Sequence, residues 1–316
     1  MAGAAVVVAG ALAIAGVFSG GDDDGGGSAS DFGGISAEPA EPPPEPTVRR
    51  IEVGGRPDAI AAGGGYIWVG DSFAGTVKRL NPGSKKPIPV DPAGYPTDVA
   101  GDEGGAWLAL ADRGAVQRLT ADEGAGEPVK VKGFPFQVAA GEDAVWAMAQ
   151  RDVQRVDPAS GEPGAVIALD GDGSSIAAGE GSVWVTRDNR EVIRVDPGSD
   201  EVSGESAAVP GAFNLTVGEG AAWVLGEAGT LTRLDPSSGA PSGGPVQVAE
   251  ALDVAAGLGY VWVASATGGV VRFDPGSGQQ VGEPIEVGPL AQAITVGEDS
   301  AWVADARDGG VYRITP

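Results

Sequence analysis

The stretch GLGYVWVASATGGVVRFDPGSG, residues 257–278, decides the fold, because variants of it recur along the chain. Each copy has a tryptophan in a short apolar run and an arginine nine to eleven residues later. The tryptophans stand 38 to 40 residues apart, at Trp68, Trp107, Trp146, Trp184, Trp223, Trp262 and Trp302. A period near 40 with four short strands per unit is typical of a β-propeller. The sequence therefore predicts an all-β fold, a seven-bladed β-propeller over residues 48–316.

Each repeat can be divided into four strands. In the first repeat we expect an inner strand at 60–62, a tryptophan strand at 66–69, an arginine strand at 76–80 and an outer strand at 87–90. The inner strands are rich in alanine, which fits seven strands that converge on one axis. The tryptophan strands are apolar on both faces, as expected for a sheet packed between two others. We therefore expect the tryptophans in the core between blades.

An arginine column accompanies the tryptophans, at Arg79, Arg118, Arg155, Arg194, Arg233, Arg272 and Arg313. A ligand contact would not be repeated in every unit. We interpret the column as structural, with each guanidinium satisfying a turn carboxylate or neighbouring carbonyl groups.

The last repeat ends at Pro316 after its arginine strand and lacks an outer strand. Residues 49–53, in RRIEVGG, match EPIEVG at 283–288. We expect this N-terminal outer strand to complete the last blade and close the ring, which removes the exposed edges of an open sheet array.

The front of the chain differs in composition. Residues 2–18 are uncharged and apolar, and as a helix they would span about 26 Å, close to the ~30 Å hydrocarbon core of a bilayer. We interpret residues 1–18 as one transmembrane helix, with a signal peptide as the alternative. Residues 19–47 are rich in Gly and Asp and then in Pro, which predicts a disordered linker. These features predict a location at the cell membrane with the propeller on the extracytoplasmic side.

Composition narrows the function classes. Histidine and cysteine are absent, which removes the commonest general base and the thiolate metal ligands. The formal net charge of -24 disfavours nucleic acid as a partner. We expect a monomeric propeller without a metal, a cofactor or catalytic residues, and we favour a binding role over an enzymatic one.

Candidate ligand-binding residues break the repeat. The position nine residues before each tryptophan should form a ring at the mouth of the central channel, and it reads Ala59, Asp98, Gln137, Ser175, Asn214, Asp253 and Ala293. Phe136 and Phe213 precede two amides of this ring, and loops after the tryptophan strands add arginines. We expect a small polar ligand or a protein or peptide to meet a set comprising Asp98, Phe136, Gln137, Arg151, Arg187, Arg190, Phe213, Asn214 and Asp253.

The pattern G-x-x-x-x-W-V followed by V-x-R-h-D-P-x-S-G resembles the repeats of virginiamycin B lyase-like and YVTN-type seven-bladed propellers. The order of membrane helix, linker and propeller also resembles the extracytoplasmic half of actinobacterial receptor serine/threonine kinases. Resemblance to the lyases implies a catalytic histidine and a bound magnesium ion, and this chain has no histidine. We expect a membrane-anchored extracytoplasmic propeller that binds a ligand or a protein as a sensor module. The alternative is a lyase-like or quinone-dependent enzyme acting at the channel mouth.

Overall fold

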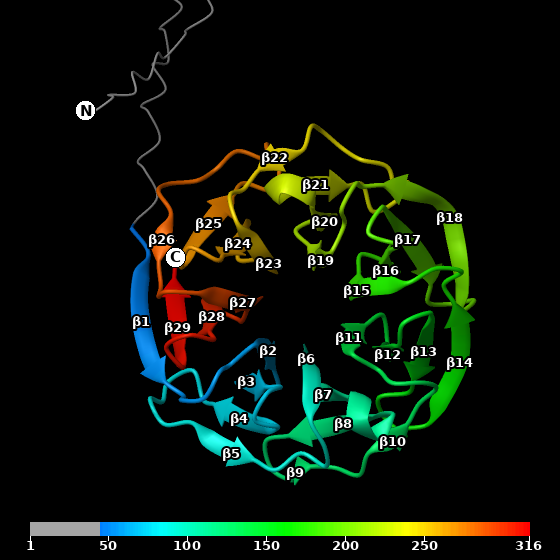
Figure 1. Ribbon diagram of the computed structural model, residues 1–316, viewed down its shortest axis with the longest axis horizontal. Coiled ribbons are helices and arrows are strands. Elements are labelled where there is room, and N and C mark those ends of the chain that lie inside the picture. The colour runs from blue at the N-terminus through cyan, green and yellow to red at the C-terminus, as the bar shows by residue number, and fades with distance from the viewer. Residues whose placement is uncertain (1–44) are drawn as a thin grey trace, which may run out of the picture. The chain divides into compact units, whose positions relative to one another are not determined.

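The computed structural model describes residues 45–316, and these form seven antiparallel sheets set radially around one axis (Figure 1). The predicted seven-bladed propeller is therefore confirmed. The proposed membrane helix and all but the last residues of the proposed linker lie outside the described residues. Within 45–316 no helix has the length and hydrophobicity needed to cross a bilayer.

Every blade runs from an inner strand at the axis to an outer strand at the rim. Blade 1 consists of β2 (Ala59–Gly63), β3 (Tyr66–Asp71), β4 (Thr76–Leu80) and β5 (Ile88–Val90). Blade 2 consists of β6 (Pro96–Asp102), β7 (Gly105–Leu110), β8 (Ala115–Thr120), β9 (Gly124–Ala125) and β10 (Val129–Lys130). Blade 3 consists of β11 (Gln137–Gly141), β12 (Ala144–Met148), β13 (Asp152–Val156) and β14 (Pro163–Ala168).

The remaining blades repeat this order. Blade 4 consists of β15 (Gly173–Gly179), β16 (Ser182–Arg187), β17 (Glu191–Asp196) and β18 (Glu201–Ala208). Blade 5 consists of β19 (Asn214–Gly218), β20 (Ala221–Gly226), β21 (Thr230–Leu234) and β22 (Val246–Gln247). Blade 6 consists of β23 (Ala251–Gly257), β24 (Tyr260–Ser265), β25 (Gly269–Phe273) and β26 (Ile285–Glu286). Blade 7 consists of β27 (Ala291–Val296), β28 (Ala301–Asp305), β29 (Gly310–Thr315) and β1 (Thr47–Glu52).

Ring closure follows the expectation from the sequence. Strand β1 pairs with β29 in antiparallel register, from Thr47 opposite Thr315 to Glu52 opposite Gly310, and the two strands lie side by side in Figure 1. Strand β1 also begins at Thr47, one residue before the expected start of the propeller. The N-terminal strand is thus the outer strand of blade 7.

The seven tryptophans form the core between blades, as predicted, and each is at most 1% exposed. Trp68 packs with Val99 and Leu108 of blade 2, and Trp302 packs with Ile60 of blade 1 across the closing seam. Neighbouring blades are therefore joined through these indole rings.

The arginine column is structural, as predicted. In six blades the guanidinium lies over the tryptophan ring of its own blade, at 5.1 to 5.9 Å from the ring centroid. Several of these side chains also donate to a carbonyl oxygen of the following blade: Arg155 to Pro197 at 2.8 Å, Arg194 to Pro236 at 3.0 Å and Arg313 to Pro82 at 3.1 Å. These arginines thereby stack on the core, and Arg155, Arg194 and Arg313 also tie one blade to the next.

Candidate functional site

A polar cavity of about 310 Å³ lies on the axis and is lined by the first residues of all seven inner strands. Because successive strands of a blade are antiparallel, the same face also carries the loops between the second and third strands. We call this side of the propeller the mouth face. The structure thus brings four predicted site residues into one cavity, namely Asp98, Gln137, Asn214 and Asp253.

These four side chains also hold neighbouring blades together. Asn214 donates to the Asp253 carboxylate at 2.8 Å. The other three follow one pattern, in which a ring side chain accepts a hydrogen bond from an inner-strand N–H of a following blade: Asp98 from Val138 at 3.0 Å, Gln137 from Ile176 at 3.0 Å and Asp253 from Ile294 at 2.7 Å. Sequence reasoning missed this structural role, although the ring position itself was identified correctly.

The cavity carries an unusual electrostatic environment. Burial raises the pKa of Asp98 to about 7, and the negative charges of Asp253 and Asp58 add to the effect. Burial likewise raises the pKa of Asp253. Near neutral pH the Asp98 carboxyl can therefore donate a hydrogen bond as well as accept one.

The two predicted phenylalanines do not enter this cavity. Phe136 is partly buried against the core of blades 3 and 4. It also lines a separate hollow on the mouth face, together with Phe134 and Arg151. Phe213 is exposed at the start of blade 5. The predicted aromatic and amide side chains therefore do not converge on the channel: the amides line the axial cavity and the phenylalanines do not.

The predicted arginines are also dispersed. Arg187 donates to Glu191 at 2.6 Å and to the Leu169 carbonyl at 2.7 Å, so its charge is used within blade 4. Arg190 lines a further hollow on the mouth face, between blades 3 and 4. Arg151 is 63% exposed and stands 3.8 Å from Asp172. Two of the three arginines thus remain accessible on this face.

Exposed aromatic side chains mark the mouth face. Four aromatics in residues 45–316 are exposed, three of them by more than half: Phe73, Tyr95, Phe134 and, at 38%, Phe213. Phe73 lies in the loop between β3 and β4, Tyr95 and Phe213 directly precede inner strands, and Phe134 stands three residues before inner strand β11. All four therefore lie on the mouth face. The exposed aliphatic side chains instead lie on outer strands: Val48, Ile88, Val166 and Val202. Sequence reasoning missed three of these aromatics, Phe73, Tyr95 and Phe134, whose positions in loops between predicted strands were the available signal.

No model of a known protein family matches the chain, and neither does any curated protein. Solved structures resemble it in large number, with 1584 matching chains, so the architecture is a common one. One of them is the hydrazine synthase of Kuenenia stuttgartiensis, with a TM-score of 0.71 and 13% sequence identity over 83% of this chain and 96% of that chain. At this identity the likeness supports the propeller fold alone.

Proposed function

We propose that this chain is a protein-binding module that holds a peptide segment of its partner on the mouth face. The propeller fold is consistent with a binding or scaffold module. The observation that carries the finer proposal is the set of four exposed aromatics on the same face as the opening of a polar cavity. Aromatic residues and arginine are the types most enriched at the energetic centres of protein interfaces.

The cavity supports the same proposal through its size and chemistry. A volume of about 310 Å³ accommodates one large side chain together with a few waters. The Gln137 side chain uses its oxygen for the Ile176 amide, which leaves its amide NH₂ for a ligand acceptor. The carboxyls of Asp98 and Asp253 provide acceptors beside it. We therefore expect a polar side chain of the peptide to enter the cavity and apolar residues of the same peptide to contact the exposed aromatics of the mouth face.

We further propose that residues 2–18 anchor the module in the cell membrane and that the propeller faces outward as a sensor. The uncharged apolar composition of this segment supports the proposal. Fractionation of cells that express the full chain, or a variant without residues 2–18, tests it. The full chain should sediment with membranes and be degraded by protease added to intact cells. Recovery of both forms in the soluble fraction would contradict the anchor.

The binding proposal can be tested with a displayed library of random peptides selected on the full chain. Selected peptides should bind Phe134→Ser and Tyr95→Ser at least tenfold more weakly, since loss of an aromatic at the energetic centre of an interface typically costs about 2 kcal/mol or more. Val202→Ser is the matched control, because Val202 is an exposed apolar residue on outer strand β18. Peptides that bind all three variants with the affinity of the parent protein would refute the mouth-face site.

A further inference from the structure

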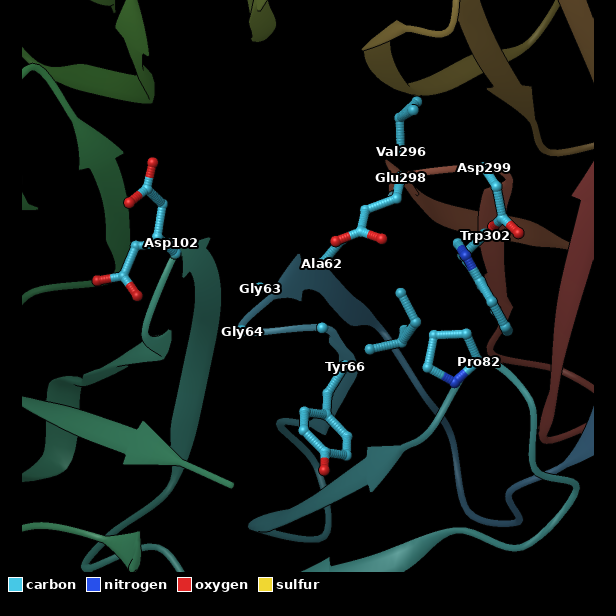
Figure 2. A pocket seen from close by; sticks show the side chains of 14 residues that line it. Ala62, Gly63, Gly64, Tyr66, Pro82, Asp102, Val296, Glu298, Asp299 and Trp302 are labelled. Atoms are coloured by element: carbon cyan, nitrogen blue, oxygen red, sulfur yellow. The ribbon is translucent and has the colours of Figure 1, made fainter. Parts of the chain in front are cut away.

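A second cavity, of about 560 Å³, lies on the face opposite the mouth, at the seam between blades 7 and 1. Figure 2 shows its walls, which include Tyr66 and Pro82 of blade 1 and Glu298, Asp299 and Trp302 of blade 7. Asp102 and Glu103 of blade 2 complete the lining. Aromatic and carboxylate side chains thus share one concave site.

Blade 1 departs from the repeat beside this cavity. In three blades a turn glutamate four residues before the tryptophan accepts a hydrogen bond from the turn of the following blade: Glu142 from Gly181 at 2.9 Å, Glu180 from Gly220 at 3.0 Å and Glu219 from Gly259 at 2.9 Å. Blade 1 has Gly64 at this position, between Gly63 and Gly65, so its turn presents no side chain. This turn packs directly on blade 2: the Gly64 N–H donates to the Asp102 carbonyl at 2.8 Å, and a Cβ on Gly64 would lie 2.9 Å from Gly105.

Glu298 is the corresponding glutamate of blade 7, and by the repeat it would accept from Gly65 of blade 1. That hydrogen bond is not formed, and Glu298 has no hydrogen-bonded or ionic partner among residues 45–316. Figure 2 shows its side chain extending from blade 7 towards blade 1. A carboxylate that joins blades elsewhere is therefore left available to a ligand.

Trp302 gives an independent indication of a ligand. The other six indole N–H groups have acceptors: Gly63, Asp102, Gly141, Gly179, Gly218 and Gly257. The Trp302 N–H donates to nothing in the described part of the chain, although its side chain is 1% exposed. Its nitrogen lies on the edge of the ring that faces Glu298 (Figure 2). This nitrogen is not among the fully buried side-chain atoms of residues 45–316 that lack a hydrogen-bond partner, so it is open to the cavity and can donate to a ligand carbonyl there.

Of the four carboxylates that line the cavity, two are already paired with arginines. Asp299 pairs with Arg313 at 2.6 Å, and Asp102 pairs with Arg118 at 2.6 Å. Glu103, like Glu298, has no such partner in residues 45–316. The cavity therefore carries two carboxylates without an ionic partner in residues 45–316, an arrangement that favours a cation. The Tyr66 ring on its wall already has the Arg79 guanidinium over it, at 4.8 Å from the centroid.

We propose that this seam cavity binds an arginine or lysine side chain of a peptide. Glu298 pairs with the cation, Glu103 adds long-range attraction, and the Trp302 N–H donates to a carbonyl oxygen of the peptide backbone. The site is separate from the mouth face, because its lining shares no residue with the axial cavity.

The test uses capped Gly-Arg-Gly and the same peptide with citrulline, which has the shape of arginine without its charge. Full-length protein labelled with ¹⁵N-tryptophan has seven indole N–H resonances, and Trp302→Phe identifies the one from Trp302. The arginine peptide should shift that resonance selectively, and the citrulline peptide should bind at least tenfold more weakly. Equal binding of both peptides, no binding of either, or a shift confined to other indoles would overturn the proposal.

A matched pair of variants separates the site from general electrostatics. Glu298→Gln should weaken binding of the arginine peptide at least tenfold. Glu219→Gln removes the same charge from the same face and keeps an acceptor for Gly259, so its affinity should match that of the parent protein. An equal loss in both variants would mean that the acidic face attracts the peptide without a specific site. Phe134→Ser should leave this binding unchanged, so failure here is distinguishable from failure of the mouth-face proposal.

Discussion

Closure of the ring by β1 can be tested with a single side-chain truncation, Ile51→Ala. Ile51 is 2% exposed and packs with Val53, Ile60 and Val311 in the cluster that joins blades 7 and 1. Truncation of a buried isoleucine typically costs about 2 to 5 kcal/mol, from lost transfer energy and the cavity left behind. For a domain of this size 1 kcal/mol corresponds to roughly 2 to 4 °C, so the melting temperature should fall by about 4 to 20 °C.

Urea and thermal unfolding followed by tryptophan fluorescence measure this cost, because all seven indoles lie in the core. Val48→Ala is the control, since Val48 lies on the same strand and is 41% exposed. It should change the free energy of unfolding by less than about 0.5 kcal/mol. If Ile51→Ala were no more destabilising than Val48→Ala, β1 would not be needed to close the ring, and the reasoning would fail.

Three further predictions concern pH and the repeated columns. Since the pKa of Asp98 is raised to about 7, the folded state holds this proton more tightly than the unfolded state. The stabilisation from this proton should be present below about pH 4 and be lost towards pH 7. In urea titrations from about pH 4 to pH 7, the free energy of unfolding of Asp98→Asn should therefore rise relative to that of the parent protein by on the order of 1 to 3 kcal/mol. Parallel pH profiles of the two proteins would contradict this. Arg155→Met should lower the free energy of unfolding by about 1 to 3 kcal/mol through loss of its bond to Pro197, whereas exposed Arg151→Met should be near neutral. In chemical unfolding, Trp262→Phe should lower the free energy of unfolding by about 1 kcal/mol more than Trp302→Phe does, because only Trp262 loses a hydrogen bond, at 2.9 Å to Gly257. Equal losses would imply that the Trp302 N–H has a partner.

The fold could be predicted because its determinants repeat. Seven tryptophans at one period reveal the number of blades, and the match between residues 49–53 and 283–288 reveals how the ring closes. The ring position nine residues before each tryptophan also follows from the period, and it places Asp98 and Gln137 at the axis as expected.

Side-chain direction could not be predicted in the same way. Phe136 and Phe213 occupy equivalent positions in the sequence, yet Phe136 packs on the core and Phe213 is exposed. Arg187 was a candidate ligand contact from the sequence, but the register of β16 and β17 sets it opposite Glu191, to which it donates. Such outcomes depend on local backbone geometry, which a repeat pattern does not specify.

The closing seam connects the stability of the ring with the proposed binding of a cationic peptide. Glu298 and Trp302 belong to blade 7, which β1 completes, and Tyr66 belongs to blade 1, so opening of the seam would separate the two halves of the site. A ligand that binds only the closed seam stabilises it by RT ln(1 + [L]/Kd), about 2.7 kcal/mol at a hundredfold excess over Kd. Backbone amides of β1 and β29 should then exchange hydrogen more slowly with the arginine peptide present, while amides of β17 in blade 4 should change less. Equal protection in both blades would mean that the ring opens only as a whole, and that closure at β1 is no weaker than the junctions between the other blades.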